Sequence, residues 1–229
     1  MFELGRTGWQ VSSISFGAWA IGAAWGSVDD ADSLAALHRA VDSGVNVIDT
    51  ADVYGDGRSE QIVGRFVAAH PDAGFTVATK MGRRLDQVPE NYTAENFRAW
   101  LDRSRTNLGV EVIDLVQLHC PPSAVIDDDA TYDALDALVA DGVIGAYGVS
   151  VETCAQALSA ITRPGVASVQ IIYNIFRQRP QELFFREAKA RNVAVIVRVP
   201  LASGGSGGVT PPTRCTWRPD GSFPARRTT

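Results

Sequence analysis

The stretch that decides the fold spans residues 113–150 and reads IDLVQLHCPPSAVIDDDATYDALDALVADGVIGAYGVS. Residues 113–119 and 146–150 are short apolar runs that predict strands, whereas residues 131–140 carry a helical pattern that stops before Gly142. A helix between two buried strands is typical of a crossover unit, in which the two strands run parallel. The stretch therefore predicts an α/β fold.

The same alternation continues on both sides of this unit. Further strands are expected at residues 13–19, 45–50, 75–80, 168–174 and 194–200, and further helices at residues 30–43, 59–68, 93–108, 153–161 and 180–191. Seven strands in this order fit either a doubly wound sheet or a (β/α)8 TIM-type barrel without its eighth βα unit. The first strand leads into GAWAIG, residues 17–22, and not into a GxGxxG phosphate turn, which favours the barrel.

The two ends of the chain differ from this repeat. Residues 2–11 contain Gly5 and Gly8 between short apolar runs, which fits either a small hairpin that plugs the barrel bottom or a frayed terminus. From residue 203 onward no apolar period continues, and Gly, Pro, Ser, Thr and Arg predominate. We therefore expect an incomplete barrel over residues 1–204 and an irregular or disordered tail over residues 205–229.

Composition argues against several functional classes. The formal net charge is −5, without a basic stripe, which argues against nucleic-acid binding. The three cysteines, Cys120, Cys154 and Cys215, form no CxxC pair, which argues against a zinc site and a disulfide framework. No signal-peptide pattern and no run of about 18 apolar residues occurs. We expect a cytoplasmic protein that has no metal and does not enter a membrane.

Polar side chains end the predicted strands and point to chemistry. Lys80 ends an apolar strand, where a buried ammonium needs a partner, and Asp49 at the end of the preceding strand is the natural one. The pair would lie beside the phenol of Tyr54 and lower its pKa, while His119 would add a second hydrogen bond to the same substrate oxygen. This arrangement predicts a tyrosine general acid for an oxygen that gains negative charge.

Four motifs make the prediction more specific. DTADVYG at residues 49–55 is followed by Ser59, Glu60 and Gly64; VATK lies at residues 77–80, DLVQLH at 114–119 and GVS at 148–150. In this order, over residues 2–204, the chain resembles the aldo-keto reductase family. The resemblance implies a (β/α)8 barrel that uses NADP(H), without a metal, to reduce a small-molecule aldehyde or ketone.

The resemblance also implies roles for individual residues. Tyr54 would protonate the carbonyl oxygen, Lys80 and Asp49 would tune the phenol, and His119 would orient the carbonyl. The implied NADPH contacts are the carboxamide-binding residues Ser150 and Gln170, the ring-stacking Tyr173, the catalytic Asp49, and Pro200, Leu201, Ala202 and Gly204, which begin the pyrophosphate loop. Trp19 and Trp25 would form an apolar wall of the substrate pocket beside Tyr54 and His119, or else pack in the core or at the rim.

Two departures from the family pattern affect the cofactor site. Val151 stands where many relatives have asparagine, which puts one carboxamide contact in question. After Gly204 the chain lacks the Gly/Leu-rich loop and the eighth strand and helix that grip the adenosine phosphate. We therefore expect a truncated or frameshifted member. An impaired enzyme and a regulatory or binding protein are alternatives to an active reductase, and a homo-oligomer would cover the edges left open.

Overall fold

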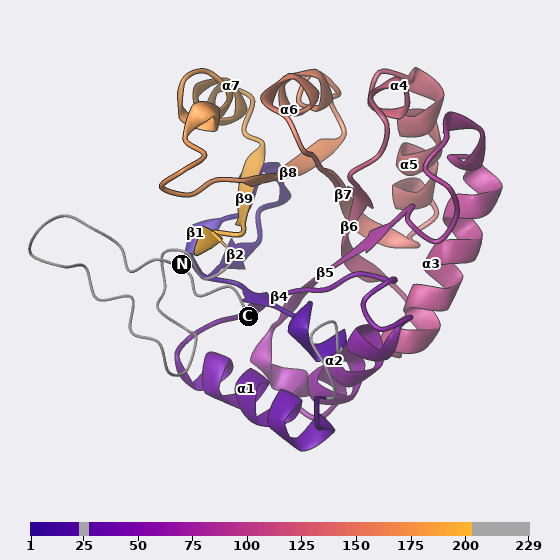
Figure 1. Ribbon diagram of the computed structural model, residues 1–229. Helices are drawn as coiled ribbons and strands as arrows, with labels where there is room; N and C mark the ends of the chain where they lie inside the picture. The colour runs from indigo at the N-terminus through magenta and orange to yellow at the C-terminus, as the bar shows by residue number, and fades with distance from the viewer. Residues whose placement is uncertain (23–27, 203–229) are drawn as a thin grey trace, which may run out of the picture.

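The computed structural model describes residues 1–22 and 28–202. Within these residues seven strands form one parallel sheet whose order follows the chain: β3 (Phe16–Gly17), β4 (Val47–Asp49), β5 (Thr76–Met81), β6 (Ile113–His119), β7 (Ile144–Ser150), β8 (Val166–Ile172) and β9 (Ala194–Arg198). A doubly wound sheet reverses its strand order at a switch point, and this sheet does not. The sheet curls into an incomplete barrel, and no pairing among the described residues joins the edge strands β3 and β9 (Figure 1).

Helices cover the outer face of the curled sheet (Figure 1). They are α1 (Asp30–Asp42), α2 (Arg58–Ala68), α3 (Ala94–Leu108), α4 (Ser123–Ile126), α5 (Asp129–Ala140), α6 (Cys154–Ala160) and α7 (Phe184–Ala190). Side-chain caps fix several helix starts: Thr93 accepts from the backbone of Asn96, and Thr153 forms a reciprocal capping box with Gln156. The main apolar core lies between these helices and the sheet.

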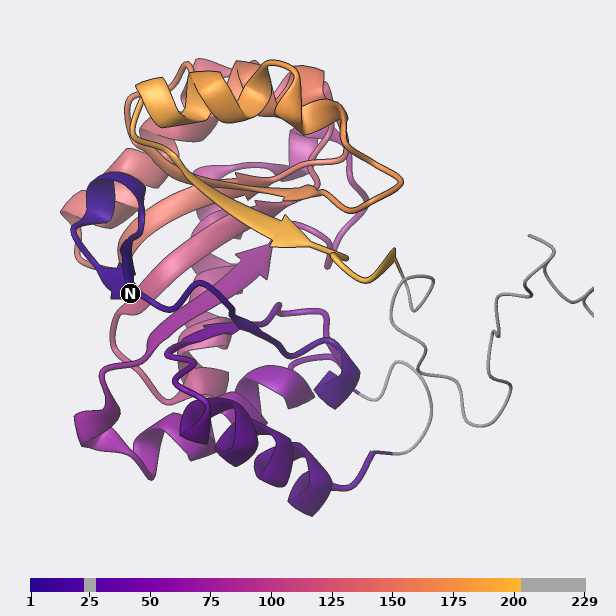
Figure 2. The same ribbon diagram turned by 90° about the vertical axis from the view of Figure 1, so that its left-hand side faces the viewer.

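A hairpin closes the bottom of the barrel, which confirms the hairpin alternative for the N-terminal segment. Strands β1 (Phe2–Glu3) and β2 (Gln10–Val11) pair antiparallel. Leu4 and Val11 pack into a buried apolar cluster with the inward-facing residues Val47, Ala78, Leu115 and Ala194. Gly5 has a φ of +53°, and a Cβ there would lie 2.6 Å from the backbone nitrogen of Ala194. Figure 2 shows this hairpin at the end opposite the strand arrowheads.

Several sequence-based boundaries need correction, among them the following three. The strand expected at residues 13–19 is only Phe16–Gly17, because it lies at an edge of the described sheet and pairs on one side, with β4. The strand expected at residues 168–174 is Val166–Ile172. The helix expected from Pro180 begins at Phe184, after a separate 3-10 turn at Arg179–Gln181. The expected tail and the domain boundary at 204/205 lie outside the described residues.

Candidate active site

Polar side chains gather where the parallel strands end. Every second residue of a strand points to the inside of the barrel. Along each strand these inward residues are apolar at the bottom of the barrel and polar at the carboxyl end. The side chains that reach this end are Asp49 on β4, Lys80 on β5, Gln117 and His119 on β6, Ser150 on β7 and Gln170 on β8. The strands thus bring six predicted or newly found polar groups to one mouth, as in other barrels of this kind.

The buried lysine has the partner that the sequence predicted. Nζ of Lys80, whose side chain is 1% exposed, lies 2.7 Å from Oδ2 of Asp49 and donates to the backbone oxygen of Thr50 at 2.7 Å. The other carboxylate oxygen of Asp49 accepts from Nε2 of Gln117 at 3.1 Å and from Nε2 of Gln170 at 3.0 Å. These hydrogen bonds hold the ammonium in one place, since a buried charge is stable only when paired and hydrogen-bonded.

Tyr54 lies beside this pair. Nζ of Lys80 is 5.2 Å from the centroid of the Tyr54 ring, and the ring meets His119 edge to face with centroids 5.9 Å apart. The loop that carries Tyr54 is fixed by close backbone contact. A Cβ at Gly22 would lie 2.7 Å from the carbonyl carbon of Tyr54, and one at Gly55, where φ is +62°, would lie 2.5 Å from the oxygen of Gly22. Only glycine fits at both positions.

The electrostatics of the phenol differ from the prediction. Burial raises the pKa of Tyr54 above its usual 10, and although Lys80 opposes this shift, it does not reverse it. The expectation of a net lowering is therefore wrong, because the loss of hydration outweighs the effect of the nearby cation on the pKa. The phenol carries its proton throughout the neutral range.

His119 is neutral at physiological pH. Burial, followed by the positive charges of Lys80, Arg83 and Arg198, lowers its pKa to about 2. Its Nδ1 is buried without a hydrogen-bond partner among the described residues. A neutral imidazole has one N–H to donate and one nitrogen that accepts, so His119 is suited to orient an oxygen rather than to provide a charge.

The residues expected to bind the nicotinamide are grouped only in part. The Ser150 hydroxyl and the Gln170 side chain are both buried and make a long contact of 3.5 Å. Tyr173 lies just beyond β8, with its hydroxyl donating to Gln181 at 2.7 Å and its ring edge-on to Phe185. Pro200 and Leu201 are exposed, Ala202 is half-buried, and Gly204 lies outside the described residues.

Of the two tryptophans expected to form a wall of the substrate pocket, the structure describes one. Trp19 follows β3 and is 47% exposed. Trp25 lies outside the described residues. Both assignments therefore stay predictions.

Sequence reasoning missed three buried or half-buried residues near the mouth. Gln117 lies two positions before His119 on the same strand face, so the period-2 pattern pointed to it. Arg198 ends β9 and was passed over inside an apolar run. Asp52 is fully buried, its two carboxylate oxygens have no hydrogen-bond partner among the described residues, and burial with nearby Glu60 raises its pKa to about 7.

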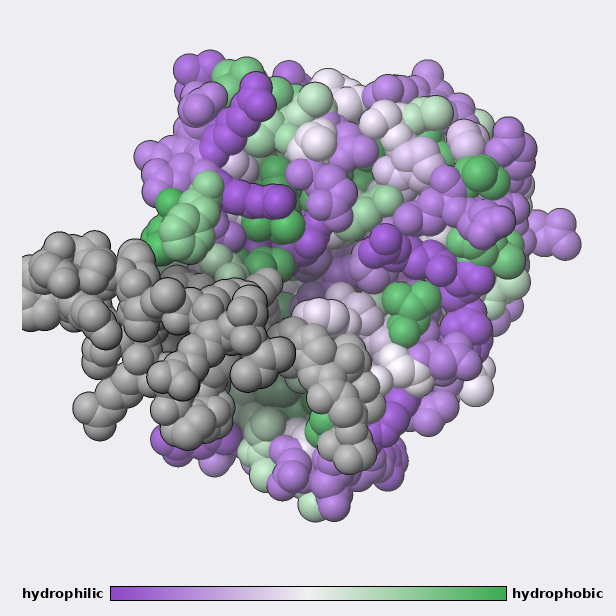
Figure 3. Space-filling view, viewed as in Figure 1, coloured by the Kyte–Doolittle hydropathy of each residue, from purple (hydrophilic) through white to green (hydrophobic). Residues whose placement is uncertain are grey.

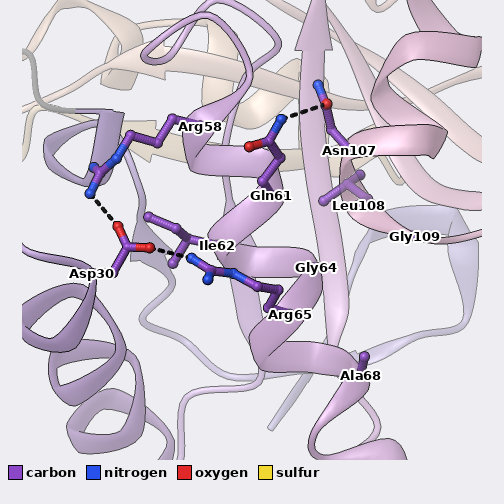
Figure 4. Close-up of a pocket in the computed structure, with 10 residues that line it drawn as sticks. All are labelled: Asp30, Arg58, Gln61, Ile62, Gly64, Arg65, Ala68, Asn107, Leu108 and Gly109. Carbon is purple, nitrogen blue, oxygen red and sulfur yellow. Dashed lines mark hydrogen bonds and ion pairs between the residues drawn. The ribbon is translucent and has the colours of Figure 1, made fainter.

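The outer surface of the barrel offers no competing polar site among the described residues that Figures 3 and 4 show. On the face shown in Figure 3, hydrophilic residues predominate and hydrophobic residues are exposed in patches between them. An open groove of about 780 Å³ runs along the outside of α2 (Figure 4). Its charges are satisfied internally, because Arg58 and Arg65 both pair with Asp30, each at 2.5 Å. This groove contains none of the polar groups at the strand ends.

Within residues 1–22 and 28–202, no group of three or more His, Cys, Asp and Glu side chains is placed to hold a metal ion. None of the helices in this part of the chain combines the length and apolar character that crossing a bilayer requires.

Comparisons with known proteins agree with the geometry. An uncharacterised oxidoreductase of Bacillus subtilis, YqkF, is 29% identical over 208 residues, which are 88% of this chain and 65% of that protein. The holo form of an aldo-keto reductase from Bacillus halodurans has a TM-score of 0.80 at 28% identity, covering 95% of this chain and 71% of that one. Glycerol dehydrogenase from Gluconobacter oxydans has a TM-score of 0.75 at 34% identity, covering 91% and 65%.

The chain spans slightly less than two thirds of the length of the first curated relatives that it matches, between 62% and 65%. The model of the aldo/keto reductase family matches residues 13–208, which include every strand of the parallel sheet. That match, with the Asp49–Lys80 pair and Tyr54 at the strand ends, shows that the chain belongs to the aldo/keto reductase family.

Proposed function

We propose that this chain is an NADPH-dependent reductase that converts an aldehyde or ketone to an alcohol, with Tyr54 as the general acid. The observation that carries the proposal is the assembly of Tyr54, the Asp49–Lys80 pair and His119 at one end of the barrel. Family membership supports it. The activity of the whole protein is part of the proposal, because the chain spans less than two thirds of its first relatives.

The side chains divide the proton chemistry between them. Tyr54 remains protonated at neutral pH, and an oxygen that gains negative charge would take this proton as its bond order falls. Lys80 would stabilise the phenolate that is left, because its ammonium is already fixed beside the ring and needs no rearrangement. The neutral imidazole of His119 would donate one N–H to the same oxygen and so orient the carbonyl.

The residues present fit a nicotinamide group. Ser150 and Gln170 offer a hydroxyl and an amide on neighbouring strands, both buried, and their mutual contact is long and easily exchanged for a carboxamide. Tyr173 would stack on the ring, and residues 200–204 would begin the pyrophosphate loop. When bound, the cofactor supplies the hydride. Preference for NADPH is carried over from the family resemblance.

A regulatory or binding protein is the second candidate. It is favoured by the unpaired edges β3 and β9 of the described sheet, since an exposed edge pairs readily with another chain. A homo-oligomer that pairs through these edges stays a prediction. A cytoplasmic location also stays a prediction, and the free thiols of Cys120 and Cys154 are consistent with it.

Titration with NADPH, followed by fluorescence quenching and by turnover of a set of aldehydes, separates these functions. Saturable binding with aldehyde-dependent oxidation of NADPH is expected. Saturable binding without turnover of any aldehyde would contradict the reductase and favour the second candidate. Absence of binding would contradict both nucleotide-dependent functions.

A further inference from the structure

Arg198 occupies an unusual position in the barrel mouth. It ends β9 on the inward face, two residues after Ile196, and its side chain is only 25% exposed. Nη2 donates to the backbone oxygen of Val151 at 3.2 Å, pairs with Glu152 at 2.8 Å, and lies 3.6 Å from Sγ of Cys120. The guanidinium therefore reaches from one side of the mouth to the residue that follows His119.

The hydrogen-bonding capacity of this guanidinium is only partly used. Nε of Arg198 is buried and has no hydrogen-bond partner among the described residues. A buried donor without an acceptor is costly, because it has lost water and gained nothing in exchange. The structure thus leaves one arginine donor unpaired next to the catalytic groups.

A second arginine adds to the positive charge of the mouth. Arg83 follows Lys80 by three residues, is exposed, and makes no hydrogen bond or ion pair with any part of the chain that the structure describes. Arg83 and Arg198 both act on the imidazole of His119 and on the carboxylate of Glu152. The two arginines therefore lie within electrostatic range of the place where a carbonyl would bind.

The charges near His119 do not cancel. The charge of Lys80 is balanced by Asp49, and that of Arg198 by Glu152, whose side chain is 53% exposed. Arg83 has no match within the described residues. A neutral aldehyde gains little binding energy from this excess of positive charge. An anion at the mouth would gain both the Coulomb attraction and the fork geometry of arginine, which suits a carboxylate.

Building on the proposed reductase function, we propose that Arg198, assisted by Arg83, binds a carboxylate on the substrate, so that the site prefers oxo acids and acid-bearing aldehydes to neutral carbonyl compounds. The substrate carboxylate replaces that of Glu152 on Arg198 and uses the free donor. Glu152, half in solvent, is released to water at little cost. The same oxyanion chemistry would suit a phosphate of the cofactor, and the experiment separates the two sources.

The test compares 4-carboxybenzaldehyde with benzaldehyde, a pair that differs only in the carboxylate. In the wild-type protein kcat/KM is expected to favour the acid. Arg198→Lys keeps the charge but loses the fork, and Arg83→Gln removes the second charge without removing any contact in the described structure. Each should lower kcat/KM for the acid, by about tenfold for Arg198→Lys, the loss expected for a charged hydrogen bond, and leave benzaldehyde unchanged. Arg186→Ala, on the exposed side of α7, is the matched control and should change neither substrate.

Glu152→Gln tests the exchange of partners without disturbing the arginine. Removing the internal carboxylate should lower KM for 4-carboxybenzaldehyde several-fold and leave KM for benzaldehyde unchanged. If the ion pair between Arg198 and Glu152 is purely structural, Glu152→Gln should instead raise KM for both aldehydes. Equal effects on the two aldehydes in all three variants would overturn the proposal.

Two binding measurements keep this inference separate from the reductase function and from the cofactor. Calorimetric titration with 4-(hydroxymethyl)benzoate and with benzyl alcohol needs no turnover, and the acid should bind at least about tenfold more tightly, through Arg198. If the protein never turns over but this preference holds, the reductase proposal fails and the carboxylate site stands. If Arg198→Lys weakens NADPH and not the acid, the arginine serves a cofactor phosphate and the inference is overturned.

Discussion

The two ends of the barrel are built from the same strands and have opposite chemistry. At the closed end the inward residues of β4, β5 and β6 join the hairpin in one apolar cluster, with Val47, Ala78 and Leu115 as their members. Two residues further along each strand, the same face carries Asp49, Lys80 and Gln117. A step of two residues keeps the face and advances the chain by about 7 Å, so one layer separates the stabilising core from the chemistry.

This difference teaches that stability and activity should be separable by position. Replacement of residues in the polar layer should remove activity and spare the fold. Replacement in the apolar layer should weaken the fold and spare the chemistry of the molecules that remain folded.

The largest effect is expected when both members of the ion pair are replaced, in Asp49→Asn with Lys80→Met. The double variant avoids leaving one buried charge without a partner, so the melting temperature should stay the same or rise. Loss of the preorganised cation beside Tyr54 should lower kcat by about 10²- to 10³-fold. Steady-state turnover and thermal unfolding of the same preparation check both halves, and turnover within tenfold of the wild type would contradict the assignment.

The next effect concerns the closed end. Leu115→Ala removes a side chain that is 1% exposed from the cluster beneath the site and should lower the free energy of unfolding by about 2–5 kcal/mol. The rate per folded molecule should stay within about threefold of the wild type. Urea unfolding measures the first quantity. Val112→Ala, on an exposed residue just before β6, is the control and should change neither.

The third effect concerns Asp52, a buried residue in the loop that follows β4, and it depends on pH. Burial raises the pKa of Asp52 from 3.8 to about 7, so the folded protein binds a proton more tightly than the unfolded chain does. Stability contributed by the protonated form is present below pH 4 and is lost as the pH rises towards 7. Asp52→Asn should therefore stabilise the protein by up to about 4 kcal/mol at pH 8 and have little effect at pH 4.

The control for this prediction is Asp72→Asn, a substitution of the same kind at an exposed position. Unfolding is measured at pH 4, 6 and 8 in all three proteins. A stability difference between Asp52→Asn and the wild type that is the same at every pH would show that Asp52 does not titrate in this window.

Much of this organisation could be predicted from the sequence. Residues 113–119 were placed without error because the apolar run is bounded on both sides by turn residues, and Thr93 marked the start of α3 by its capping chemistry. The Asp49–Lys80 contact followed from the cost of a buried ammonium. Local sequence was sufficient wherever a local physical rule decided the outcome.

The remainder depended on contacts between distant parts of the chain. The extent of β3 is set by pairing with β4 on one side, which no local pattern reports. The net shift of the Tyr54 pKa depends on how completely the ring is buried, and the sequence shows the cation but not the lost water. Arg198 was missed because its partners, Val151 and Glu152, are about 46 residues away along the chain.

The most direct test of the central claim is the single-turnover rate of carbonyl reduction in Tyr54→Phe, measured at saturating NADPH. Tyr132→Phe is the matched control, since its hydroxyl is buried, remote from the mouth and without a hydrogen-bond partner among the described residues. The account predicts a loss of at least about 100-fold in Tyr54→Phe with unchanged NADPH affinity, and no loss in Tyr132→Phe. A rate for Tyr54→Phe equal to that of the wild type would contradict it.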